Sequence, residues 1–158
     1  MKTEWFALII AVLAVIVGPF VSYKIAKMQI RAQTLKTWKR EELNSIRESI
    51  NEFLSLYSKL VMLVHDKKLG IIDRVKYLET FDNIFQKLLF LRDRFPLILD
   101  MKKQINLEFY KHIKSVISIV LETENKDWSD KTVKLSNDIA ELGVMIINEE
   151  KKILEKKL

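Results

Sequence analysis

Two histidines are the first residues to consider for chemistry, because the sequence contains no cysteine. His112 follows Glu108 by four residues, a spacing that places both side chains on one face of a helix. A di-metal site in a helical bundle requires Glu-x-x-His pairs and further inward carboxylates. The spacing here differs, and His65 stands beside Asp66, whose side chain would leave a helix in another direction. We therefore predict no metal site and no cofactor, and we interpret both histidines as structural.

Catalytic motifs for nuclease or hydrolase chemistry are missing from the sequence. Helical ribonucleases of the HEPN type carry an Arg shortly before the catalytic His, whereas Lys59 precedes His65 and Asn106 precedes His112. No glycine-rich phosphate loop and no Gly-x-Ser-x-Gly elbow is present. The sequence therefore predicts a protein that is not an enzyme.

Basic side chains are the best candidates for binding a ligand. They gather near the end of the second predicted helix and on the polar side of the third. Arg and Lys suit an anionic ligand, especially at a symmetric interface. A solvated charged face is the alternative interpretation of the same pattern. The candidate ligand-binding residues are Arg92, Arg94, Lys102, Lys103, Lys111 and Lys114.

Four amphipathic helices are expected to position these residues. Apolar residues from Leu43 to Val64 alternate three and four apart, which is typical of a helix in a bundle. Gly70 and Pro96 mark the ends of the first two helices. The apolar stripe of the second helix is expected to be Val75, Leu78, Phe81, Phe85 and Leu88, with Ile84, Leu91 and Phe95 beside it. The predicted helices span about 43–69, 71–95, 97–124 and 129–156. Short connections favour an antiparallel four-helix bundle, so the predicted fold class is all-α.

An uncharged segment from Trp5 to Tyr23 precedes these helices. As a helix it would be about 28 Å long, close to the roughly 30 Å hydrocarbon core of a bilayer. The segment is predicted to be a transmembrane helix and not a cleaved signal peptide, because its positive charge follows the apolar run. Small residues spaced four, three and four apart give a candidate self-association seam, with chance alignment as the alternative. The seam consists of Ala7, Ala11, Ala14 and Gly18.

The net charge of +6 is concentrated directly after this segment. Residues 24–40 hold six basic and no acidic residues, which leaves 20 basic and 20 acidic residues in 41–158. A neutral domain argues against direct binding of duplex nucleic acid. The cluster instead indicates a cytoplasmic segment of a bacterial inner-membrane protein with its N-terminus outside. The residues predicted to contact the membrane surface are Lys24, Lys27, Arg31, Lys36, Trp38, Lys39 and Arg40.

The predicted organisation is a transmembrane anchor at 1–23, a basic stalk at 24–42 and a helical domain at 43–158. The sequence resembles small bacterial single-pass membrane proteins in Ser22-Tyr23-Lys24-Ile25-Ala26-Lys27, in Trp38 and in Ile46-Arg47-Glu48. This resemblance implies an anchor, a juxtamembrane Trp and a helical cytosolic domain. Trp38 would either pack on that domain or lie on the lipid headgroups. In size and layout the chain is also similar to membrane effectors of type III CRISPR defence, which respond to a cyclic oligoadenylate.

Two functional hypotheses follow. The first is a non-enzymatic effector of bacterial antiphage defence, whose helical domain senses a nucleotide second messenger and whose homo-oligomer perturbs the lipid bilayer. The second is a membrane-anchored adaptor or scaffold that docks a protein partner. A co-purifying nucleotide would favour the effector, and an exposed apolar surface would favour the adaptor.

Overall fold

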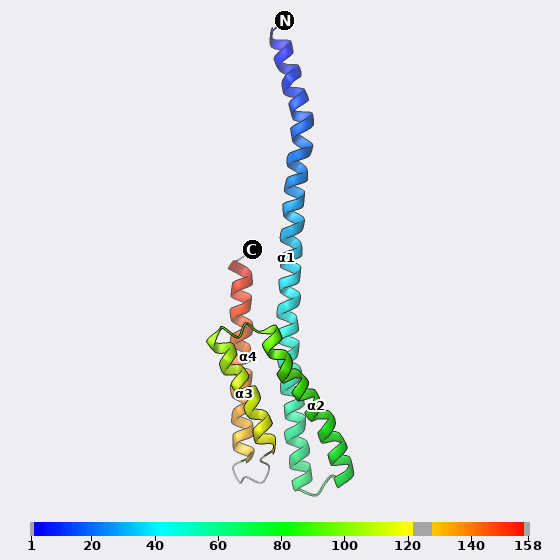
Figure 1. The fold of residues 1–158 in the computed structure, drawn as a ribbon, viewed down its shortest axis with the longest axis vertical. Coiled ribbons are helices and arrows are strands. Elements are labelled where there is room, and N and C mark those ends of the chain that lie inside the picture. Colours follow the sequence, from blue (N-terminus) through cyan, green and yellow to red (C-terminus); the bar gives the residue numbers. More distant parts are fainter. Residues whose placement is uncertain (1, 122–127, 157–158) are drawn as a thin grey trace. The chain divides into compact units, whose positions relative to one another are not determined.

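A computed structural model of the chain describes the backbone of residues 2–121 and 128–156, and the side chains of 21–120 and 128–155. These residues form four α-helices and no strand (Figure 1). The helices are α1 Lys2–Lys68, α2 Arg74–Ile98, α3 Gln104–Leu121 and α4 Trp128–Lys156. The described part of the chain is therefore all-α, as the periodicity predicts.

Two compact units divide the chain, with the boundary between Arg40 and Glu41. The first unit is the N-terminal part of α1. The second contains the remainder of α1 together with α2, α3 and α4. All the packing described below belongs to the second unit.

The structure contradicts the predicted transmembrane helix. Among the residues described, no helix holds an apolar stretch long enough to cross a membrane. The physical reason is charge: from Val21 onward α1 carries cations at short intervals, beginning with Lys24 and Lys27. The expected single-pass transmembrane helix and the inner-membrane location that depends on it are therefore wrong. The seam residues Ala7, Ala11, Ala14 and Gly18 lie outside the described side chains.

The heptad predicted for α1 is confirmed in the second unit. Its buried members are Ile46, Ile50, Phe53, Tyr57, Leu60 and Val64. Three buried phenylalanine rings join α1, α2 and α3 at the centre of the core. Phe95 meets Phe53 edge-on at a centroid distance of 5.9 Å and Phe109 at 5.1 Å. Such edge-to-face pairs add to the stabilisation that burial of the rings supplies.

The buried face of α2 agrees with the predicted one at Leu88, Leu91 and Phe95 but differs towards the start of the helix. Val75 and Leu78 are exposed, whereas Phe81 and Phe85 are half-buried and stack on each other. The residues that α2 buries are Tyr77, Leu88, Leu91 and Phe95. Apolar side chains occur on several sides of this helix, so periodicity alone does not select the face that packs.

The α1–α2 connection is fixed by local hydrogen bonds. Gly70 has φ of 71°, a left-handed conformation that glycine adopts without strain. The N–H of Gly70 donates to Lys67 O at 3.1 Å, and the N–H of Ile71 donates to Asp66 O at 3.0 Å. Asp73 Oδ1 then caps α2 by accepting from two backbone N–H groups, at 2.8 and 3.2 Å. These bonds end α1 where the sequence predicts and start α2 three residues later than predicted.

Gly143 allows α4 to approach α1 closely. A Cβ added at Gly143 would lie 2.9 Å from Cγ2 of the buried Ile50. Overpacking of this kind typically costs about 1–3 kcal/mol, and the better helix propensity of Ala recovers about 1 kcal/mol. We expect Gly143→Ala to lower the free energy of unfolding by up to about 2 kcal/mol in a urea titration.

A double-mutant cycle tests whether the contact with Ile50 causes the loss of stability in Gly143→Ala. Ile50→Ala removes the Cγ2 atom that the new methyl group would meet, so Gly143→Ala should be tolerated better in that background. A Gly143→Ala protein about 1 kcal/mol more stable than the wild type would contradict the close approach, because it would show the gain in helix propensity without a clash.

Candidate functional site

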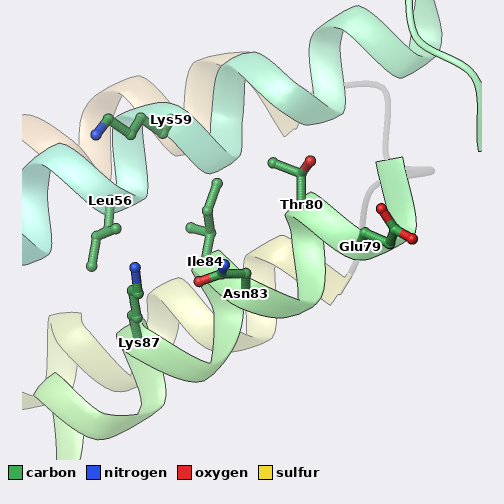
Figure 2. A pocket seen from close by; sticks show the side chains of 7 residues that line it. All are labelled: Leu56, Lys59, Glu79, Thr80, Asn83, Ile84 and Lys87. Carbon is green, nitrogen blue, oxygen red and sulfur yellow. The ribbon is translucent and has the colours of Figure 1, made fainter. Parts of the chain in front are cut away.

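An open groove of about 390 Å³ lies between α1 and α2. Leu56 is buried and Ile84 is half-buried, so together they form an apolar floor. The groove is lined by Leu56, Lys59, Glu79, Thr80, Asn83, Ile84 and Lys87. In Figure 2, Leu56 points from α1 towards α2, and Thr80, Ile84 and Lys87 point from α2 towards α1.

Helical spacing explains how α2 supplies its side of the groove. Glu79, Asn83 and Lys87 recur at four-residue intervals, so they share one face of the helix. Thr80 and Ile84 lie on the adjoining row. The short side chains of Thr80 and Asn83 leave space that longer residues would fill.

The two ends of the groove carry opposite charge. The ammonium groups of Lys59 and Lys87 lie at the Leu56 end, and Glu79 lies at the other end beside Thr80 (Figure 2). None of the salt bridges among the described residues involves Lys59 or Lys87. Both lysines are exposed. An anionic group that approaches this end of the groove would therefore meet two cations that take part in no salt bridge among the described residues.

Hydrogen-bonding groups lie between the charged ends. The Thr80 hydroxyl can donate and accept, and the Asn83 amide can do both at separate atoms. No nucleophile paired with a general base is present among the seven lining residues. The arrangement suits recognition of a ligand with an apolar side and an anionic end.

The six basic residues predicted to bind a ligand are not gathered into one site. Arg92 donates to Asp93 at 2.7 and 3.1 Å, and this hydrogen bond lowers the pKa of the Asp93 carboxyl. Arg94 donates to Ser45 Oγ at 3.1 Å. All six lie outside the lining of the α1–α2 groove. They are distributed over α2 (Arg92, Arg94), the connection to α3 (Lys102, Lys103) and α3 itself (Lys111, Lys114).

Two of these lysines contact other side chains. Lys103 forms an ion pair with Glu150 of α4. The ammonium of Lys114 lies 4.7 Å from the centroid of the Tyr110 ring on the same helix. Both are typical contacts between surface side chains of one protein.

His112 interacts with the backbone of Glu108 and not with its carboxylate. Its Nδ1 lies 2.9 Å from Glu108 O, and its Nε2 lies 3.8 Å from Asp138 Oδ2. Across the described residues, no three His, Asp or Glu side chains are grouped so as to hold a metal ion. His112 therefore connects α3 with α4.

His65 lines a second pocket of about 410 Å³, where α1 ends and α4 begins. In this pocket the Lys68 ammonium lies 4.7 Å from the Trp128 ring, whose Nε1–H donates to Ile119 O at 3.0 Å. Two of its lining residues, Trp128 and Ser129, directly follow residues 122–127 in the sequence, which lie outside the described residues. The α1–α2 groove is therefore the better-defined candidate site.

The residues predicted to contact a membrane surface belong to the first unit. Lys24, Lys27, Arg31, Trp38 and Arg40 are exposed, and Lys36 and Lys39 are half-buried. The membrane location behind that prediction is corrected above. These residues therefore form a strongly cationic segment of α1, and no membrane contact is inferred for it.

Sequence reasoning missed the groove residues Lys59, Asn83 and Lys87. The four-residue spacing on α2 was the available signal, but a solvated helix face has the same spacing. Lys59 comes from a different helix, and no spacing rule relates residues of separate helices. No protein-family model, no curated protein and no solved structure matches this chain. Inference about function therefore rests on the geometry of the groove and the surface.

Proposed function

We propose that the protein is a non-enzymatic helical adaptor that binds an acidic, amphipathic segment of a partner protein in the α1–α2 groove. The observation that carries this proposal is an apolar floor bordered at one end by two lysines that form no described salt bridge. Leu56 and Ile84 would receive an apolar side chain of the partner. Lys59 and Lys87 would bind a carboxylate next to it.

The openness of the groove favours a polypeptide over a small molecule. Small-molecule sites enclose most of the ligand surface, usually in a concave pocket. This groove instead runs along α2 from Glu79 to Lys87, about 12 Å at 1.5 Å per residue, and is open to solvent along that length. That length equals about two turns of a docked helix, as in helix-in-groove recognition.

Site-specific crosslinking in the full chain tests the adaptor proposal. A photoreactive amino acid at Asn83, which is exposed and lines the groove, would label whatever lies there. We expect a discrete polypeptide adduct in the cells that express the protein. Lys59→Glu with Lys87→Glu should reduce the adduct at least about tenfold, because two attractive charges become repulsive.

A matched charge reversal controls for the change in net charge. Lys76 and Lys134 are exposed and lie outside the groove lining. Lys76→Glu with Lys134→Glu should leave the adduct unchanged. Equal adduct yields for the two double variants would contradict the groove as the docking site. A nucleotide retained in native mass spectrometry and lost only with Lys59→Glu and Lys87→Glu would identify a ligand sensor and overturn the adaptor.

A further inference from the structure

A narrow apolar stripe runs along the first unit of α1. Its members are spaced four, three, four and three residues apart. At about 100° per residue they fall within about 80° of the helix circumference. A stripe this narrow is typical of a coiled-coil seam, whereas the apolar face of a helix packed in a globular core is wider. The stripe consists of Val21, Ile25, Met28, Ala32 and Leu35.

No side chain in the described part of the structure covers this stripe. The exposed fractions of its four large members lie between 45% for Val21 and 71% for Met28. Exposed apolar side chains that recur at heptad spacing indicate a surface that pairs with another helix.

The same heptad register continues into the part of α1 that the bundle buries. Steps of seven from Ile25 reach Ile46, Phe53 and Leu60, and steps of seven from Leu35 reach Ser49, Leu56 and Leu63. These six residues are all buried. In the sequence, the stripe and these buried positions therefore share one heptad register, interrupted by the polar residues Lys39 and Glu42. Within the second unit, the bundle covers the positions in this register from Ile46 to Leu63.

Charge on both flanks of the stripe decides what kind of partner fits. With Ile25 and Ala32 at position a, Lys24 and Arg31 occupy position g, and Lys36 occupies position e. In a parallel pair of two copies, Arg31 of one chain would face Lys36 of the other. An antiparallel pair would also bring cations together, since residues 24–40 contain no acid. Like charges at these positions work against pairing with a second copy.

The opposite side of the helix argues against a lipid surface. Tyr23 and Ile30 lie about 180° from the centre of the stripe. A helix that lies on a bilayer concentrates its apolar residues on one broad face. A narrow seam with cationic flanks and further apolar residues behind it suits a partner helix better.

We propose that residues 21–35 of α1 form one side of a coiled coil with an acidic amphipathic helix of another protein. Ile25 and Met28 lie at the centre of the interface, and acids at the partner's e and g positions pair with Lys24, Arg31 and Lys36. This surface is independent of the α1–α2 groove, so either proposal can fail without the other.

A pair of synthetic helices provides the probe. Both peptides would contain about three heptads with Leu at a and d, one with Glu and the other with Lys at e and g. Fluorescence anisotropy with the full chain at low ionic strength should give a Kd at least about tenfold lower for the acidic peptide. Raising the salt concentration should reduce the difference in Kd between the two peptides, because salt screens exposed charges.

Two isoleucines five residues apart provide matched variants. Ile25 lies in the stripe and Ile30 on the opposite side, and both are exposed. Ile25→Ser should raise the Kd for the acidic peptide at least about tenfold, whereas Ile30→Ser should leave it within about twofold. Equal circular dichroism spectra would show that both variants keep the helix.

Several outcomes would overturn the proposal. Equal affinity for the two peptides would show that the cationic flanks do not select an acidic partner. Equal effects of Ile25→Ser and Ile30→Ser would show that the stripe is not the binding surface. A dimer in sedimentation velocity that Ile25→Ser dissociates would make a second copy the occupant. Binding to vesicles of phosphatidylcholine and phosphatidylglycerol, without binding of the acidic peptide, would make the surface a lipid-binding one.

Discussion

Replacing Phe95 by Ala should lower the free energy of unfolding by about 3–5 kcal/mol, the range for truncating a fully buried aromatic residue. Phe95 is completely buried and contacts the rings of Phe53 and Phe109. It therefore joins α2 to both α1 and α3. Its removal leaves a cavity where three helices meet, and the remaining rings can fill that cavity only by moving the helices that carry them.

Phe90 provides a matched control on the same helix. Its side chain is 68% exposed, so Phe90→Ala should change the free energy of unfolding by less than about 1 kcal/mol. Urea titrations followed by circular dichroism measure both variants, and an unchanged m value would show that the unfolded state is unaffected. Equal losses for Phe90→Ala and Phe95→Ala would contradict the packing of α2.

The contrast between α1 and α2 shows where sequence reasoning succeeds. In α1 most residues outside the heptad from Ile46 to Leu60 are polar, so the pattern indicates a single apolar face. In α2 the exposed Val75 and Leu78 are as apolar as the buried Leu88 and Leu91. Which face of α2 is buried depends on the helices that pack against it, and the local sequence pattern does not identify those helices.

Helix ends were predictable where a residue's backbone requirement is strict. Gly70 ends α1 because the turn needs a positive φ. Pro96 was expected to end α2, but the helix continues to Ile98. A proline in the last turn loses only its own N–H bond, and the N–H of Leu99 still donates to Phe95 O at 2.9 Å.

The candidate site was less predictable than the fold. Clustered basic residues in the sequence suggested a ligand site, but Arg92 pairs with the adjacent Asp93 and Arg94 bonds to Ser45. Lys59 and Lys87 belong to different helices, and the fold brings them to one groove. A binding surface that depends on tertiary contacts cannot be read from the spacing within one helix.

Alkaline pH should destabilise the bundle through Tyr57. This side chain is buried, and its hydroxyl donates to Thr132 O at 3.3 Å. Burial disfavours the phenolate and raises the pKa of Tyr57 from 10.0 to about 12. In the unfolded chain the phenol ionises near pH 10, but in the folded chain only near pH 12. Its contribution to stability is therefore complete below pH 10 and is lost as the pH rises from 10 to 12.

Tyr57→Phe isolates that contribution. A difference of about two pKa units corresponds to about 2.7 kcal/mol at the alkaline end. Below pH 10 the variant should be less stable by about 0.5–1.5 kcal/mol, because it lacks the hydrogen bond to Thr132. Above pH 10 its stability should fall less steeply than that of the wild type, so urea midpoints measured from pH 8 to 12 should converge and then cross. Parallel curves for Tyr57→Phe and the wild type would mean that the Tyr57 phenol ionises as readily in the folded chain as in the unfolded one.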